Sequence, residues 1–162
     1  MEETAQQALF PWSAQLNVGV EEIDAQHQEL VNLLNALHAS ISAHQPLDRT
    51  RAALNDLADY TRTHFVVEES LMRVFGYPGF GHHKHIHEAL MLQIKQLQQT
   101  LDAEHTEISP DQLDFLKVWL IQHISEADKR FGEYLVKVGT AQEWSAHVRE
   151  TMERRTWWWK FW

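Results

Sequence analysis

The chain has 162 residues, of which 44% are hydrophobic, enough for one domain with a single core. It contains no cysteine, which excludes disulfide frameworks, zinc fingers and cysteine-bound iron–sulfur clusters, so any bound metal must be held by His, Asp or Glu. The formal net charge of −9 argues against a nucleic-acid partner, because proteins that bind nucleic acid need a basic face.

No targeting or membrane-spanning segment is expected. Residues Met1 to Phe10 contain acidic residues but lack the basic segment with which a signal peptide begins. No run of about 18 apolar residues occurs. The expected compartment is therefore the cytoplasm.

Residues 1–19 are predicted to form an irregular N-terminal arm, because Pro11, Asn17 and Gly19 interrupt regular structure. From about Glu21 the apolar spacing becomes helical. The inner positions of this first helix alternate by fours and threes, at Ile23, His27, Leu30, Leu34, Leu37 and Ile41. One histidine thus lies in an otherwise apolar seam.

Two more helices follow the break at Pro46. The second has its inner positions at Leu54, Leu57, Thr61, His64, Glu68, Leu71 and Phe75. A turn is predicted over residues 76–81, which are rich in glycine. The third helix then has its inner positions at His83, His87, Leu90, Ile94, Leu97 and Leu101.

A fourth helix begins at Ser109-Pro110-Asp111-Gln112, which is a capping box with proline at the first helical position. Its inner positions are Leu113, Leu116, Leu120, His123 and Ala127, with Tyr134 further on. Gly139 is expected to end it, and Thr140-Ala141-Gln142-Glu143 to open a short C-terminal helix.

This pattern predicts an all-α fold, an antiparallel up-down-up-down four-helix bundle with an N-terminal arm and a short C-terminal helix. The predicted divisions are an arm at 1–19, a bundle at 20–138, and a C-terminal helix with a Trp-rich basic tail at 139–162. Helices of similar length joined by short loops bring the polar inner residues to one end of the bundle.

A cluster of polar inner residues is hard to explain as ordinary core. A single buried histidine is more often a hydrogen-bonded core residue than a metal ligand. Here, however, each of the four helices contributes at least one polar residue to the same end of the bundle. Each unsatisfied buried polar group costs about 1–3 kcal/mol, and a shared metal removes that cost. The spacing selects His27, His64, Glu68, His83, His87 and His123.

The same stretches resemble the bacterial branch of the hemerythrin family over about residues 12–137. The resemblance rests on five separated motifs in order: Gly19-Val20, Ile23-Asp24 and Gln26-His27; His64-Phe65, Glu68-Glu69 and Met72; Tyr77-Pro78; His83 and His87; and Trp119-Leu120, His123-Ile124 and Asp128. Asp128 comes from this resemblance alone, because five residues past His123 it is rotated by about 140° on an ideal helix.

The resemblance implies two non-haem iron ions bridged by hydroxide or oxide. Three histidines, His83, His87 and His123, would hold one iron, and His27 and His64 the other. Glu68 and Asp128 would bridge the two. Spacing and ligand type alone would also accept manganese, cobalt or zinc.

The function implied is reversible dioxygen binding for carriage, storage or sensing, with oxygen held as hydroperoxide on the iron that has an open position. The resemblance also implies a dioxygen pocket lined by Trp119, Leu120 and Ile124, which are equally good core residues. An enzyme acting on peroxide, nitric oxide or ferrous iron is one alternative, and an oxygen-sensing signalling module is another.

The other histidines are expected at the surface. His82 and His85 flank the third-helix pair but point about 100° or more off its face, and a slipped pairing that uses them is the minor alternative. Four more are expected to be surface or helix-end residues: His38, His44, His105 and His147.

Residues Arg154 to Trp162 form a tail with five aromatic and three basic residues. Interleaved tryptophan and basic residues suit a membrane surface or the groove of a partner protein. Folding back onto the bundle is an equally good interpretation, and nine residues are too few to span a bilayer.

Overall fold

The computed structural model describes residues 9–104 and 107–138. Within these ranges the chain is helical, with no strand. The predicted C-terminal helix and tail at 139–162, the first part of the predicted arm, His105 and His147 lie outside the described residues. None of the described helices is long and apolar enough to cross a bilayer.

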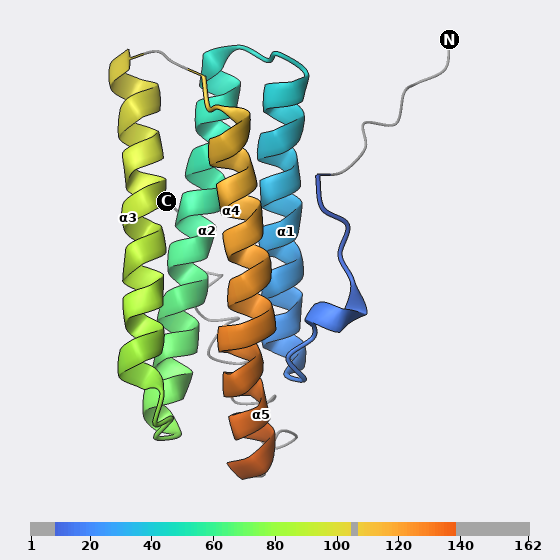
Figure 1. Cartoon of the computed structure of the whole chain (residues 1–162), viewed down its shortest axis with the longest axis vertical. Coiled ribbons are helices and arrows are strands. Elements are labelled where there is room, and N and C mark those ends of the chain that lie inside the picture. Colours follow the sequence, from blue (N-terminus) through green and yellow to red (C-terminus); the bar gives the residue numbers. More distant parts are fainter. Residues whose placement is uncertain (1–8, 105–106, 139–162) are drawn as a thin grey trace, which may run out of the picture.

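The helices stand side by side in alternating directions and form an antiparallel bundle of four rods (Figure 1). The first three rods are α1 (Glu21–Ser42), α2 (Leu47–Val74) and α3 (Phe80–Glu104). The fourth is continuous but composite, and consists of α4 (Pro110–Gln122), the π-helical segment η2 (His123–Asp128) and α5 (Lys129–Val138). The predicted all-α four-helix bundle is therefore confirmed.

The helix boundaries follow local chemistry. Ser109 Oγ accepts a hydrogen bond from Gln112 N at 3.3 Å, and Gln112 Oε1 accepts one from Ser109 N at 2.8 Å, so the predicted capping box is present. The turn after α2 is shorter than predicted. Phe80 already starts α3, because His83 N donates to Gly79 O at 3.0 Å.

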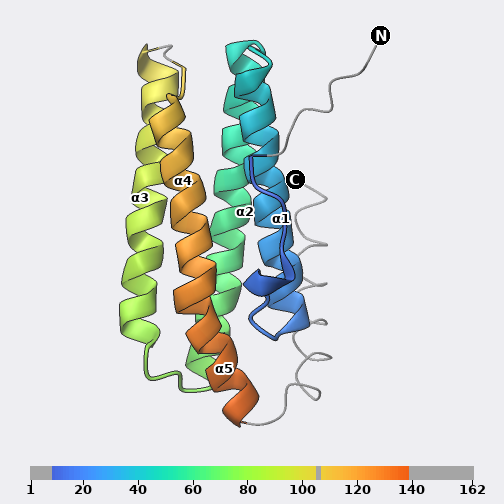
Figure 2. The same cartoon turned by 45° about the vertical axis from the view of Figure 1, so that its right-hand side comes forward.

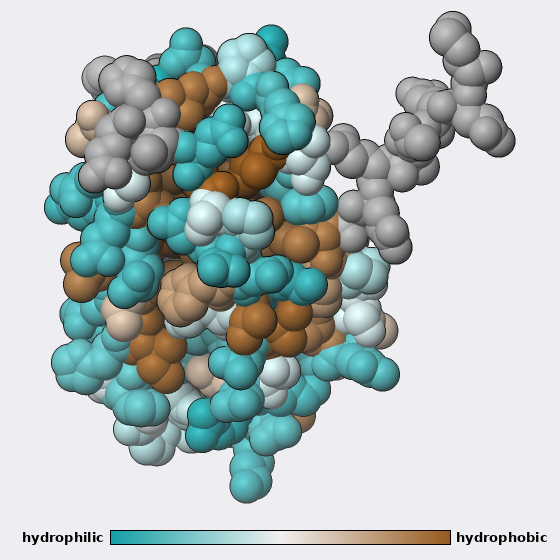
Figure 3. Space-filling view, turned by 45° about the horizontal axis from the view of Figure 1, so that its top comes forward, coloured by the Kyte–Doolittle hydropathy of each residue, from teal (hydrophilic) through white to brown (hydrophobic). Residues whose placement is uncertain are grey.

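The predicted apolar inner positions form the core. They are buried between the four rods and include Ile23, Leu30, Leu34, Leu37, Leu54, Leu57, Leu90, Ile94, Leu97, Leu101, Leu113, Leu116 and Leu120. Outside, hydrophilic side chains are interspersed with hydrophobic patches at the end that carries the α1–α2 and α3–α4 connections (Figure 3). The polar inner residues are thus the exception within an apolar interior.

The described part of the arm runs along α1 and contains the short helix η1 (Ala14–Leu16) (Figure 2). The Asp24 carboxylate accepts hydrogen bonds from Val18 N at 2.6 Å and Gly19 N at 3.2 Å. Gly19 has φ of +91°, a left-handed conformation that glycine adopts without strain. The arm also packs closely on α5, because a Cβ added to Gly132 would lie 2.3 Å from Val18 O.

Candidate metal centre

All four rods contribute side chains to one buried polar cluster. It contains His27 from α1, His64 and Glu68 from α2, His83 and His87 from α3, and His123 and Asp128 from η2. All seven residues are buried, with an exposed fraction of 5% or less. The structure therefore brings together every residue that the sequence analysis put forward as a ligand.

Asp128 faces the cluster because the fourth rod changes its helical pitch. Residues His123–Asp128 form a π-helical turn, in which hydrogen bonds run from residue i to residue i+5. This wider turn brings residues five apart onto one face, and His123 Nε2 lies 3.0 Å from Asp128 Oδ1. An ideal α-helix would have turned Asp128 away from the cluster.

The first group of ligand atoms is built around three imidazoles. His87 Nε2 lies 3.1 Å from His83 Nε2 and 3.0 Å from His123 Nε2. Two atoms bound about 2.1 Å from one ion and about 90° apart are about 3.0 Å apart, whereas tetrahedral ligands are about 3.4 Å apart. Both distances therefore fit nitrogens that bind one ion at about 90° to each other.

Both carboxylates complete this first group. Glu68 Oε2 lies 3.2 Å from His83 Nε2 and 3.3 Å from His87 Nε2. Asp128 Oδ1 lies 3.1 Å from His83 Nε2. Three nitrogens and two oxygens thus converge on one point.

A second group lies beside the first and uses the same two carboxylates. Asp128 Oδ2 lies 3.1 Å from His27 Nε2, and Glu68 Oε2 lies 3.9 Å from His64 Nε2. The ring centroids of His27 and His64 are 4.9 Å apart. Two ion positions that share both carboxylates are the arrangement that this geometry offers.

Several buried atoms of the cluster have no hydrogen-bond partner in the described part of the chain. They are His27 Nδ1 and Nε2, His64 Nε2, His123 Nδ1, both oxygens of Glu68 and both oxygens of Asp128. Burying polar atoms in this state is costly, and coordination of a cation by the oxygens and the Nε2 atoms removes much of that cost. The residues present therefore fit a metal centre.

Without a cation, the two carboxylates are balanced by protons on the imidazoles. Burial lowers the pKa of His83, but the nearby carboxylates of Asp128 and Glu68 outweigh burial and raise the pKa to about 9. Burial and the Asp128 charge raise the pKa of Glu68, but the nearby imidazoles of His83 and His87 bring it down to about 2. Burial lowers the pKa of His64 to about 3. A metal ion must therefore displace protons to enter.

Two side chains outside the cluster orient the imidazoles. His64 Nδ1 donates to Gln26 Oε1 at 2.8 Å, and His87 Nδ1 donates to Glu69 Oε1 at 3.1 Å. Fixing the Nδ1 proton leaves Nε2 free to coordinate and makes it more basic. Sequence reasoning gave these two residues no role, although each directly neighbours a cluster residue in the chain.

Aromatic rings hold two further imidazoles in place. Phe65 stacks on His87 with ring centroids 3.6 Å apart, and Trp119 stacks on His123 at 4.5 Å. The sequence analysis did not predict the stacking of Phe65 on His87, because an aromatic residue next to His64 is expected to be an ordinary core residue.

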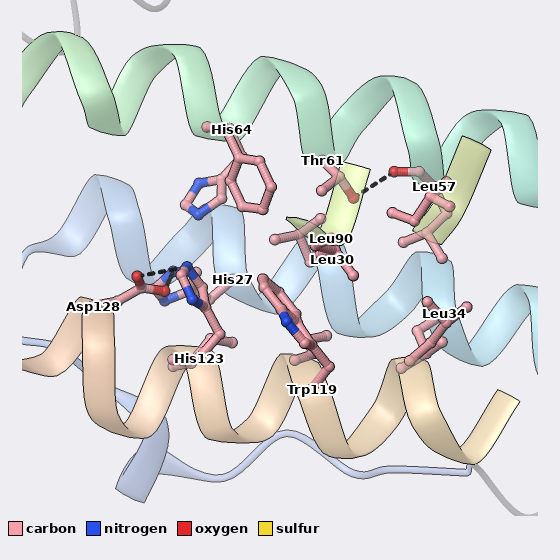
Figure 4. A pocket seen from close by; sticks show the side chains of 15 residues that line it. His27, Leu30, Leu34, Leu57, Thr61, His64, Leu90, Trp119, His123 and Asp128 are labelled. Atoms are coloured by element: carbon pink, nitrogen blue, oxygen red, sulfur yellow. Dashed lines mark hydrogen bonds and ion pairs between the residues drawn. The ribbon is translucent and has the colours of Figure 1, made fainter. Parts of the chain in front are cut away.

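A small apolar cavity lies beside the cluster and runs along the bundle axis. Figure 4 shows His27, His64, His123 and Asp128 at one end of it and Leu34 and Leu57 at the other. The space open to the centre of a water-sized molecule is about 20 Å³, room for one diatomic molecule or one water. The predicted pocket residues Trp119, Leu120 and Ile124 all line this cavity.

The other four histidines of the described residues lie outside the cluster. His82, His85 and His44 are exposed, and His38 is half-buried with its Nε2 3.1 Å from Ser42 Oγ. The slipped pairing through His82 or His85 thus has no support in this geometry.

Comparison with known proteins identifies the family and supports the fold. The profile of the family described as "Hemerythrin HHE cation binding domain" matches residues 18–135. The chain belongs to the hemerythrin family. This hemerythrin-family chain is 33% identical over 130 residues to a bacteriohemerythrin of Stenotrophomonas maltophilia (strain R551-3), covering 78% of the chain and 81% of that relative.

A second sequence relative and a solved structure support the same family. A bacteriohemerythrin of Methylococcus capsulatus (strain Bath) is 32% identical over 129 residues, covering 79% of the chain and 98% of the relative. A solved structure titled "Crystal structure of hemerythrin:wild-type" superposes with a TM-score of 0.73 at 32% identity, covering 78% of the chain and 97% of that structure. The His/Glu/Asp cluster thus lies within a hemerythrin-family cation-binding domain.

Proposed function

We propose that the chain binds dioxygen reversibly at two iron ions. The proposed ligands are His83, His87 and His123 for one ion and His27 and His64 for the other, with Glu68 and Asp128 shared. The observation that carries the proposal is the pair of ligand groups with two common carboxylates at the end of a small apolar cavity. Two bound irons supply two electrons to dioxygen and recover them on release.

The unequal ligand sets support a specific place for dioxygen. The first group offers three imidazoles, whereas the second offers only two besides the shared carboxylates. An ion held by the second group would have more coordination sites left for an exogenous ligand. Of the three histidines that line the cavity, His27 and His64 belong to this second group and His123 to the first.

The cavity lining supports reversible binding rather than reduction of dioxygen to water. Apart from the cluster residues, its wall is made of Leu, Ile, Phe and Trp side chains and one threonine. The Thr61 hydroxyl donates to Leu57 O at 2.7 Å, as Figure 4 shows, so its proton is already committed. Outside the cluster the wall carries no acidic side chain and no uncommitted hydroxyl, which limits the proton supply that further reduction needs.

The donor set also favours reversible chemistry. Five imidazoles and two carboxylates give the centre less negative charge than carboxylate-rich di-iron bundles have. Fewer anionic ligands stabilise high oxidation states of iron less well. Carriage, storage and sensing of dioxygen would all use this same reversible step.

The test is a visible absorption spectrum of the iron-loaded chain. After anaerobic reduction the sample is exposed to oxygen and then returned to argon, and iron per chain is measured in parallel. We expect two irons per chain and a charge-transfer band that appears with oxygen and disappears under argon. Irreversible decay to the diferric form, or turnover of added peroxide, would favour the enzyme alternative. Binding of fewer than two irons would refute the ligand assignment.

A further inference from the structure

The two ligand groups differ in what lies behind their imidazoles. His87 Nδ1 donates to the carboxylate oxygen Glu69 Oε1 at 3.1 Å, whereas His64 Nδ1 donates to the amide oxygen Gln26 Oε1 at 2.8 Å. His87 belongs to the first group, which has three histidines, and His64 belongs to the second, which has two. An anion therefore backs a ligand of the first group, and a neutral amide backs a ligand of the second.

The charge of Glu69 is directed at His87. Arg73 follows Glu69 by four residues on α2, a spacing at which acidic and basic side chains commonly pair. The Arg73 guanidinium instead lies over the Phe80 ring, with Cζ 4.9 Å from the ring centroid. Within the described residues, no lysine or arginine lies within ion-pairing distance of the Glu69 carboxylate, so its charge acts on the imidazole.

The His87 ring is held from two sides. Phe65 stacks on it with ring planes only 7° apart, and the side chain of Glu69 is 18% exposed, so water has little access to the hydrogen bond. A hydrogen bond to a carboxylate is stronger than one to an amide, and it makes the opposite nitrogen of the ring a better electron donor to a metal. His87 Nε2 is therefore the more strongly activated ligand.

Electrostatic repulsion makes the two positions fill one after the other. Both groups use Glu68 and Asp128. The first cation neutralises part of the negative charge of these carboxylates, and it then repels the second cation. The ion that enters last therefore binds more weakly, and the order of filling depends on which group has the stronger ligands.

We propose that Glu69 makes the first group the tighter metal position, so that the first ion to bind occupies it and the second group fills afterwards. Three imidazoles against two favour the same order, and Glu69 widens the difference. Because Glu69 acts through His87, it is a positioning residue and not a ligand. The inference rests on the ligand assignment of the proposed function but not on dioxygen binding.

The experiment is a titration of the metal-free full chain with Co²⁺ under argon, in competition with a chromophoric chelator. Histidine and carboxylate ligands accept cobalt as well as iron. We expect two binding steps, the first tighter than the second. Glu69→Gln keeps an acceptor oxygen but removes the charge, so the first step should weaken about tenfold and the second should change much less.

Glu88→Gln is the matched control. It removes the same charge from the residue after His87, but this exposed carboxylate pairs with Lys84 Nζ at 2.6 Å and with His85 Nδ1 at 3.2 Å. Because these partners belong to neither ligand group, both binding steps should be unchanged.

Two substitutions at the second group assign the order of filling. Gln26→Glu places a carboxylate behind His64 and should tighten the second step about tenfold, which narrows the gap between the steps. His64→Ala removes a ligand of the second group alone, so the second step should disappear while the tighter first step remains. A purely structural effect of Glu69→Gln would instead weaken both steps, because the groups share two carboxylates.

Three outcomes would overturn the proposal: an unchanged first step in Glu69→Gln, equal weakening of both steps in that variant, or loss of the tighter step in His64→Ala. Circular dichroism melting of each metal-free variant confirms that the compared proteins are folded. A chain that loads cobalt in the expected order but forms no reversible dioxygen band would refute only the proposed function. A chain that binds a single cobalt ion would refute the ligand assignment and this inference with it.

Discussion

Replacing Gly132 by alanine should destabilise the fold, because the backbone of the arm occupies the space that a side chain needs. The added Cβ would lie 2.3 Å from Val18 O and 3.0 Å from Val18 Cβ. Val18 cannot easily retreat, since Asp24 Oδ1 accepts from its N–H at 2.6 Å. Neighbouring Asn17 is also tied down, because Lys129 Nζ donates to its carbonyl at 2.7 Å.

The magnitude follows from two opposing terms. Overpacking of a rigid site costs about 1–3 kcal/mol, and alanine regains about 0.5–1 kcal/mol of helix propensity over glycine. The expected net loss is about 1–2 kcal/mol in the free energy of unfolding. For a chain of this size that lowers the melting temperature by about 2–8 °C.

The assay is urea denaturation followed by far-UV circular dichroism, with all proteins stripped of metal so that metal content does not differ. Gly81→Ala is the matched control, because a Cβ at this helical position meets nothing within 4 Å. It should keep or raise stability, by up to about 1 kcal/mol. If Gly132→Ala were as stable as Gly81→Ala, the inferred packing of the arm on α5 would be wrong.

Three further changes test the metal centre. Glu68→Ala removes a carboxylate from both ligand groups and should leave fewer than two irons per chain by metal analysis, whereas exposed His85→Ala should keep two. Thr61→Val should leave the dioxygen spectrum unchanged and alter the free energy of unfolding by less than about 1.5 kcal/mol, because the hydroxyl donates to Leu57 O and not to a molecule in the cavity. Faster autoxidation of the variant would contradict this. Metal affinity, measured by competition with a chelator, should rise with pH up to about 9, because a proton must leave His83 before the metal binds. In the metal-free protein the same proton stabilises the fold. This stabilisation is complete below pH 6.5 and is lost as the pH rises through about 9. A pH-independent affinity would refute this last expectation.

Local patterns in the chain predicted the helices well because helix formation depends on residues three and four apart. The apolar spacing placed the inner faces, and the capping box at Ser109 located the start of α4. The turn after α2 was predicted two residues too long, since Phe80 and Gly81 lie inside α3. Gly81 is a poor helix former, and only the hydrogen bond from His83 N to Gly79 O shows that the helix already includes it.

The same spacing rule brought out six of the seven cluster residues and missed one. Asp128 would face away from His123 on a regular helix, and only the π-helical turn brings them within 3.0 Å. A π turn is unfavourable on local grounds and persists where tertiary contacts compensate for it. No period of 3.6 residues can reveal such a turn; the family resemblance supplied Asp128 instead.

The sequence by itself determined the helices, their inner faces and the end of the bundle where histidines and carboxylates meet, because these depend on short-range periodicity and on loop length. Only the tertiary structure decided that two ligand groups share Glu68 and Asp128, that Gln26 and Glu69 orient the imidazoles, and that the arm lies against Gly132. Such contacts join residues 18 to 114 positions apart in the chain, for example Glu69 with His87 and Val18 with Gly132. Their distances are set by how the rods pack against one another, which no local pattern encodes.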